Sequence, residues 1–104
     1  MIKNMTPHEI VLCDRDGVAI KTFPSEGLVR LKATTVSAGE VNGFPLTKTV
    51  FGEPEGLPEE KGYQWYIVSQ LVKTALPHRR DLLVPAEMVR DSEGKILGCQ
   101  SFGV

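Results

Sequence analysis

The amino-acid sequence predicts an α+β, β-dominated fold: a small antiparallel sheet or a partly open barrel built from hairpins, with one short helix. Its 104 residues suit a single domain spanning 1–104. The 10 Gly and 7 Pro exceed the usual share of these residues and indicate many turns. The apolar runs between the turns are of strand length.

The first hairpin is predicted near the N-terminus. The run His8 to Cys13 is apolar and rich in branched residues, and the run Val18 to Phe23 alternates like a strand. Asp14 to Gly17 between them has the composition of a tight turn. A strand follows at Leu28 to Val36, where apolar and polar residues alternate. We expect one face of that strand to be buried and the other to be solvated.

A second hairpin is predicted at Asn42-Gly43, because both residues tolerate the positive φ angles of a type I′ turn. The return strand is expected at Leu46 to Phe51, after Pro45, which favours a sheet edge because it cannot donate a backbone hydrogen bond. Residues 52–64 are rich in Gly, Pro and Glu and are expected to form a long loop.

The second half of the chain predicts the helix and a third hairpin. A strand at Trp65 to Val68 precedes Ser69, an N-cap residue, and a helix at Gln70 to Leu76 that ends before Pro77. A strand at Leu82 to Val84 is expected to stop at Pro85. The third hairpin joins Met88 to Arg90 with Lys95 to Cys99 through Asp91 to Gly94, and Gln100 to Val104 is expected to be a tail.

The predicted core consists of the apolar residues on the inner faces of these elements. Because a buried aromatic side chain contributes about 3–5 kcal/mol, loss of Trp65 is expected to threaten the fold. The core residues are Ile10, Leu12, Val18, Ile20, Val29, Leu31, Val50, Trp65, Ile67, Leu71, Val72, Leu83, Val89 and Ile96.

Composition and charge limit the kinds of partner the protein can bind and the cellular compartment in which we expect it. The formal net charge of −1 supplies no field to attract nucleic acid, although Tyr63, Trp65 and Tyr66 could stack bases. No apolar run is long enough to span a membrane, and no export signal is visible. We therefore predict a cytoplasmic protein, or one in the host cytoplasm if phage-encoded, with Cys13 and Cys99 as free thiols.

Metal and cofactor sites are not predicted. His8, Cys13, His78 and Cys99 are zinc-ligand types, but they lack the short spacings of zinc knuckles. No phosphate-binding glycine loop or nucleophile motif is present. The sequence accordingly predicts no cofactor.

Two groups of polar residues are candidates for ligand binding. Thr6 and His8 precede the first main strand, where side chains from neighbouring strand ends, including Ser69, could meet. The second group follows the helix, where the macrodipole also favours positive charge. It could clamp a phosphate or carboxylate, with Asp81 orienting one guanidinium. This group consists of His78, Arg79, Arg80, Asp81 and Arg90.

Several segments resemble a group of roughly hundred-residue hypothetical proteins found in tailed phages, prophages and bacterial genomes. The resemblance covers nearly the whole chain and implies a phage or mobile-element origin, but it implies no activity and no functional residue. The matching segments are Asn4 to Ile10, Gly39 to Pro45, Thr49 to Pro58, Tyr66 to Ser69, Asp81 to Pro85, Val89 to Asp91, Gly94 and Ile96 to Cys99.

These observations favour a non-catalytic, phage-type accessory binding protein that counters a host defence. Its expected partner is either a small anionic, nucleotide-like ligand or a host protein. The alternative is a small hydrolase or nucleotide-modifying enzyme, with His8 or His78 as general base and Arg79 and Arg80 holding a phosphate. Exposed hairpin edges also favour a homo-oligomer.

Overall fold

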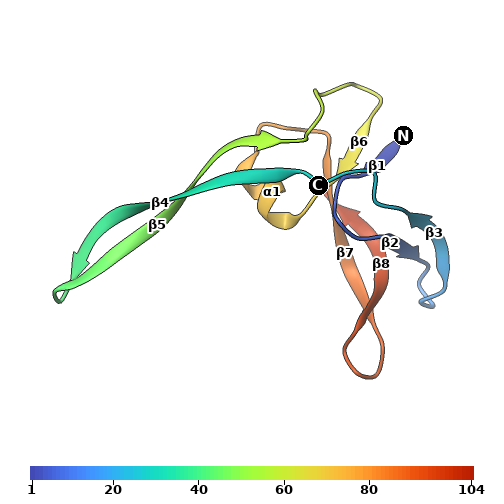
Figure 1. Cartoon of the computed structure of the whole chain (residues 1–104). Helices are drawn as coiled ribbons and strands as arrows, with labels where there is room; N and C mark the ends of the chain where they lie inside the picture. The colour runs from blue at the N-terminus through green and yellow to red at the C-terminus, as the bar shows by residue number, and fades with distance from the viewer.

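Two sheets make up most of the chain, which a computed structural model describes over residues 1–104 (Figure 1). One sheet has six strands in the order β1-β6-β7-β8-β2-β3, and the other is the hairpin β4-β5. The strands are β1 Ile2–Asn4, β2 Ile10–Cys13, β3 Ala19–Phe23, β4 Arg30–Val41, β5 Phe44–Glu55, β6 Trp65–Ile67, β7 Leu82–Arg90 and β8 Ile96–Gly103; the helix is α1 Gln70–Ala75. The predicted fold class, β-dominated with one short helix, is confirmed.

The pairing within the six-stranded sheet is mixed. The hairpins β2-β3 and β7-β8 are antiparallel, as their turn residues predict. The pairs β1-β6, β6-β7 and β2-β8 are parallel. β6 and β7 are consecutive strands joined through α1, whereas the pairs β1-β6 and β2-β8 join distant parts of the chain, about which local turn chemistry carries no information.

Asn4 brings the two edges of the six-stranded sheet together. It lies at the end of β1 and forms a parallel bridge with Ser25, just after β3. Its carbonyl oxygen accepts a hydrogen bond from the Glu26 N–H at 2.8 Å, and its side-chain Nδ2 donates to the carbonyl oxygen of Phe23 at 2.9 Å. The sheet is therefore nearly closed into a barrel, with a fully buried asparagine at the seam.

Helix α1 covers one face of the short parallel strands. Ser69 caps it as predicted, accepting a hydrogen bond from the Val72 N–H at 3.3 Å. Val72 packs with Tyr66, Val68, Leu82 and other residues in the larger core cluster. On the opposite face, a smaller cluster contains Ile10, Ile67, Leu83 and Cys99. These two clusters hold the body of the protein together.

The hairpin β4-β5 leaves this body as an extended arm (Figure 1). Each of its strands has 12 residues, and nearly all of them are exposed. The radius of gyration is 17.0 Å, whereas a compact chain of this size has about 13 Å. The Asn42-Gly43 turn at the free end is confirmed, with φ angles of 50° and 82°. We call residues 30–55 the arm.

Several predicted core positions are wrong, mostly because a strand has one or both faces open. The expectation that the strand at Leu28 to Val36 buries one face fails beyond Leu31, where β4 enters the arm. Trp65 is 39% exposed, so its loss should disturb the fold far less than predicted. The predicted core residues that are exposed are Val18, Ile20, Val50, Trp65, Leu71 and Ile96.

Four strands extend beyond their predicted ends, among them β4, which continues past Val36 to Val41. β7 continues through Pro85 to Arg90, because it has only β8 beside it beyond Leu83, and a strand with one open edge tolerates proline. The expected tail at Gln100 to Val104 instead pairs with β7 as far as Gly103. β5 extends to Glu55, with a register shift opposite Leu31 and Ala33, so the expected loop at 52–64 is shorter.

Candidate functional site

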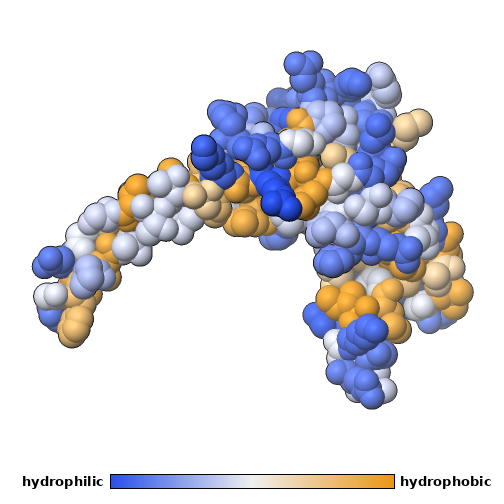
Figure 2. All heavy atoms as spheres, in the orientation of Figure 1, coloured by the Kyte–Doolittle hydropathy of each residue, from blue (hydrophilic) through white to orange (hydrophobic).

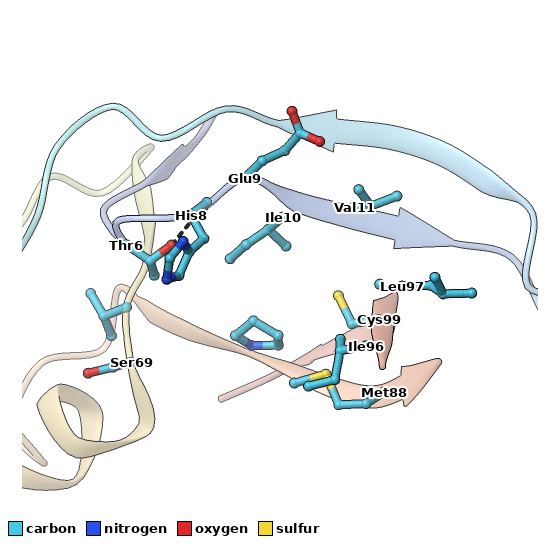
Figure 3. Close-up of a pocket in the computed structure, with 13 residues that line it drawn as sticks. Thr6, His8, Glu9, Ile10, Val11, Ser69, Met88, Ile96, Leu97 and Cys99 are labelled. Carbon is cyan, nitrogen blue, oxygen red and sulfur yellow. Dashed lines mark hydrogen bonds between the residues drawn. The ribbon is translucent and has the colours of Figure 1, made fainter. Parts of the chain in front are cut away.

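An open cleft of about 330 Å³ lies beside β2 and the β7-β8 hairpin (Figure 3). Its floor and one wall are apolar and include Ile10, Met88, Ile96, Leu97 and Cys99. Thr6, His8, Glu9 and Ser69 lie along its polar rim. Three residues predicted to bind a ligand, Thr6, His8 and Ser69, therefore line one cleft.

Asn4 fixes the loop that carries Thr6 and His8. Its Oδ1 accepts hydrogen bonds from the Thr6 backbone N–H at 3.0 Å and from Thr6 Oγ1 at 2.6 Å. Its Nδ2 donates to the carbonyl oxygen of His8 at 2.7 Å. The asparagine that closes the barrel thus also sets the polar rim of the cleft.

The rim side chains differ in how free they are to bind. Ser69 is committed to capping α1. The Thr6 hydroxyl lies within hydrogen-bond distance of Asn4 Oδ1. It also lies within hydrogen-bond distance of the carbonyl oxygen of His8 (Figure 3). The His8 side chain is exposed at the rim. Thr6 and Ser69 therefore retain little free polar capacity, and the apolar floor of the cleft suits an apolar group.

Gly98 allows β8 to approach β2 at the base of the cleft. A Cβ atom there would lie 2.6 Å from the carbonyl oxygen of Val11 and 2.7 Å from Cys13 Sγ. The two strands share a single registered pair, Leu12 with Cys99. Cys13 and Cys99 are both buried free thiols, and burial raises the pKa of the Cys99 thiol, an effect that backbone hydrogen bonds partly oppose.

The raised pKa of Cys99 predicts an alkaline loss of stability. Below the ordinary thiol pKa, folded and unfolded chains are both protonated. Above it, the unfolded chain ionises while the folded chain resists, so the free energy of unfolding falls as pH rises. Guanidinium unfolding between about pH 7.5 and about pH 9.5 should show a smaller decline for Cys99→Ala than for the wild type. An equal decline in both proteins would contradict this prediction.

The predicted contact between Asp81 and one guanidinium group is present, and the guanidinium belongs to Arg79. Arg79 forms a bidentate ion pair with Asp81, from Nε to Oδ1 at 2.9 Å and from Nη2 to Oδ2 at 2.6 Å. Nη2 also donates to the carbonyl oxygen of Pro58 at 2.9 Å. The hydrogen bonds to Asp81 raise the pKa of Arg79. Arg79 therefore ties the loop before β6 to the start of β7.

Of the remaining residues in the predicted clamp, only His78 shares a cavity with Arg79. His78 and Arg79 line a cavity at the base of the arm, together with Phe51 and Glu53. Arg80 is exposed. Arg90 lies at the end of the β7-β8 hairpin, where Nη1 donates to the carbonyl oxygen of Gly94 at 2.9 Å. Neither Arg80 nor Arg90 lines the cavity with His78 and Arg79.

The arm has one distinctly apolar face. Alternate residues of β5 share a face, and the register places their β4 partners beside them. The register shift between Ser37 and Gly39 moves the alternation by one residue, so Val41 returns to the face that carries Val36. This apolar face consists of Val36, Val41, Phe44, Leu46 and Val50, with Thr34, Gly39 and Lys48 between them.

Each side chain of the apolar face is open to solvent, and Phe44 beside the turn is 70% exposed. Figure 2 shows apolar atoms along the arm and at its free end. The opposite face is mainly polar, with Thr35, Ser37, Glu40, Thr47 and Thr49, and its apolar members are Pro45 near the turn and Ala33 and Phe51 near the base. An isolated two-stranded hairpin is only marginally stable in water, so the arm is suited to contact a further surface.

Comparisons with known proteins assign no class to this fold and site. No protein-family model, curated protein or solved structure matches the chain. No group of three or more His, Cys, Asp or Glu side chains converges to hold a metal ion. The structure has no helix with the length and apolar character of a membrane span.

Sequence reasoning missed most of the apolar part of the site. Met88 and Leu97 were assigned to strands without a role, and Ile96 was placed in the core, yet all three line the cleft. The alternation of the arm was visible in Phe44, Leu46 and Val50. Whether these apolar residues are buried or exposed depends on the tertiary structure, and only the fold shows that nothing covers them.

Proposed function

We propose that this protein is a non-catalytic binding protein whose arm contacts another protein. The observation that carries the proposal is the apolar face of the arm, which remains exposed on a hairpin that leaves the body. Exposed apolar patches of this kind mark protein interaction sites. A phage-type accessory protein that binds a host protein, as predicted from the sequence, would use such a surface.

The other predicted functions have weaker support. Binding of a small anionic ligand needs several free cations at one place, but Arg79 is paired with Asp81, and Arg80 and Arg90 lie outside its cavity. An enzyme with His8 as general base would need its phosphate clamp nearby, and His8 and Arg79 line separate cavities. His78 and Arg79 do share a cavity, so an enzyme with His78 as general base and Arg79 as phosphate ligand is the form of the alternative that the structure favours.

Shortening the arm tests the proposal. Deleting residues 34–50 and joining the paired residues Ala33 and Phe51 through Asn-Gly keeps the hairpin base and its turn geometry. Cross-linking in the cells that produce the protein should give complexes larger than the monomer with the full chain, and these should disappear with the shortened chain. Circular dichroism checks that the body stays folded. Equal cross-linking of the two chains, or none with either, would refute the proposal.

A further inference from the structure

The molecule has two apolar features that no other part of the chain covers. One is the free end of the arm, where the Asn42-Gly43 turn presents Val41 and Phe44. The other is the cleft, where Met88, Ile96 and Leu97 are 44%, 50% and 51% exposed. Figure 2 shows apolar atoms at the free end of the arm and on the body where the β7-β8 hairpin leaves it.

Resting on the proposed function, we infer that the partner of the arm is a second copy of this chain, and that Phe44 of one copy occupies the cleft of the other. The arm extends away from its own body (Figure 1), so its free end does not reach the cleft of the same chain. The contact is therefore made between copies. This one contact buries both the free end of the arm and the cleft.

The size and chemistry of the cleft fit an aromatic side chain. A cavity of about 150 Å³ suffices for a benzene ring, and the cleft has about 330 Å³. It therefore accommodates the Phe44 ring together with part of the turn. The aliphatic and sulfur-bearing side chains of Ile10, Met88, Ile96 and Cys99 in the cleft suit an aromatic ring (Figure 3).

Charges near the two surfaces are also complementary. Glu40 pairs with Pro45 close to the turn, on the face of the arm opposite Phe44, and is exposed. Lys95 and Arg90 flank the apolar wall of the cleft, since Lys95 precedes Ile96 in sequence and Arg90 pairs with Ile96. When the turn is seated end-on, with Phe44 in the cleft, the opposite face of the arm carries the Glu40 carboxylate toward the cations beside the cleft, which makes association sensitive to salt.

Two single variants separate the two surfaces. Phe44→Ser removes the inserted ring, and Leu97→Glu places a charge on the cleft wall; both positions are exposed, so neither change disturbs the core. Light scattering should show the wild type larger than a monomer, with the dissociation constant raised about tenfold to about a hundredfold in either variant. Tyr63→Ser is the matched control, because Tyr63 is 71% exposed and lies outside both surfaces.

Mixing the two variants tests the direction of the contact. Phe44→Ser keeps an intact cleft and Leu97→Glu keeps an intact arm, so the mixture should associate more tightly than either variant alone. A photo-reactive phenylalanine analogue at position 44 should cross-link to the peptide spanning residues 85–99 of another copy. Mass spectrometry identifies that peptide.

A monomeric wild type, unimproved association in the mixture, or cross-links elsewhere would each overturn the inference. These failures are distinct from failure of the proposed function. If arm shortening still removes complexes with a different protein while no contact between copies is found, the binding role stands and the second copy is rejected. If arm shortening changes nothing, the binding role itself is rejected.

Discussion

Replacement of Asn4 by Ala is expected to lower the free energy of unfolding by about 3–4 kcal/mol, a large fraction of the stability of a small domain. The Asn4 side chain is fully buried and bonds the carbonyl oxygens of His8 and Phe23 and the backbone N–H of Thr6. Alanine leaves these groups without their partner at the seam of the barrel. Each stranded polar group costs about 1–3 kcal/mol unless water reaches it.

Denaturant unfolding of Asn4→Ala beside Gln70→Ala measures this effect. Gln70 also carries an amide, but its hydrogen bond to Thr74 Oγ1 is exposed on α1, so its loss should cost less than about 0.5 kcal/mol. Asn4→Asp should also destabilise the protein, because a carboxylate cannot donate to the two carbonyl oxygens. Similar unfolding midpoints for the Asn4 and Gln70 alanine variants would show that Asn4 does not hold the seam.

Replacement of Arg79 by Ala is expected to cost about 3 kcal/mol, whereas Arg80→Ala next to it should cost less than about 0.5 kcal/mol. The side chains of Arg79 and Asp81 are only 14% and 5% exposed, so alanine at position 79 leaves a buried carboxylate without its counter-ion. It also releases the carbonyl oxygen of Pro58. Arg80 has an exposed side chain and no ion pair.

The double variant Arg79→Met with Asp81→Leu separates ion pairing from packing. Removing both charges should recover much of the loss, because the cost of the single variant comes mainly from the unpaired carboxylate. Urea unfolding midpoints of the three variants and the wild type provide the measurement. Equal destabilisation by Arg79→Ala and Arg80→Ala would contradict a structural role for the Arg79–Asp81 pair.

Sequence patterns correctly predicted the turns, hairpins and helix cap that depend on residues close together in the chain. The Asn42-Gly43 turn, the Ser69 cap and the Asp-x-x-Gly hairpins each depend on residues close together in the chain, and all are confirmed. The parallel pairing of β1 with β6 depends on residues more than sixty positions apart, as in Ile2 with Trp65. No periodicity or turn residue in either strand specifies that pairing.

The candidate site was predicted only in part, for a related physical reason. Thr6, His8 and Ser69 were expected to meet at strand ends, and they line one cleft. Arg79 and Asp81 were expected to interact, and they do. The burial of that pair was not foreseen. Apolar residues such as Val50 and Ile96 were assigned to the core, because apolar character alone does not distinguish a core face from an interface.

The single registered pair between β2 and β8 divides the sheet into two parts with different opening behaviour. Leu12 with Cys99 is the one point at which their ladders meet, so the β2-β3 hairpin can separate without breaking the β7-β8 ladder. In native-state hydrogen exchange, backbone amides of β2 and β3 should exchange through partial opening, well before those of β6 and β7. The cleft that we propose to receive Phe44 is thus lined in part by a segment that can move as a unit.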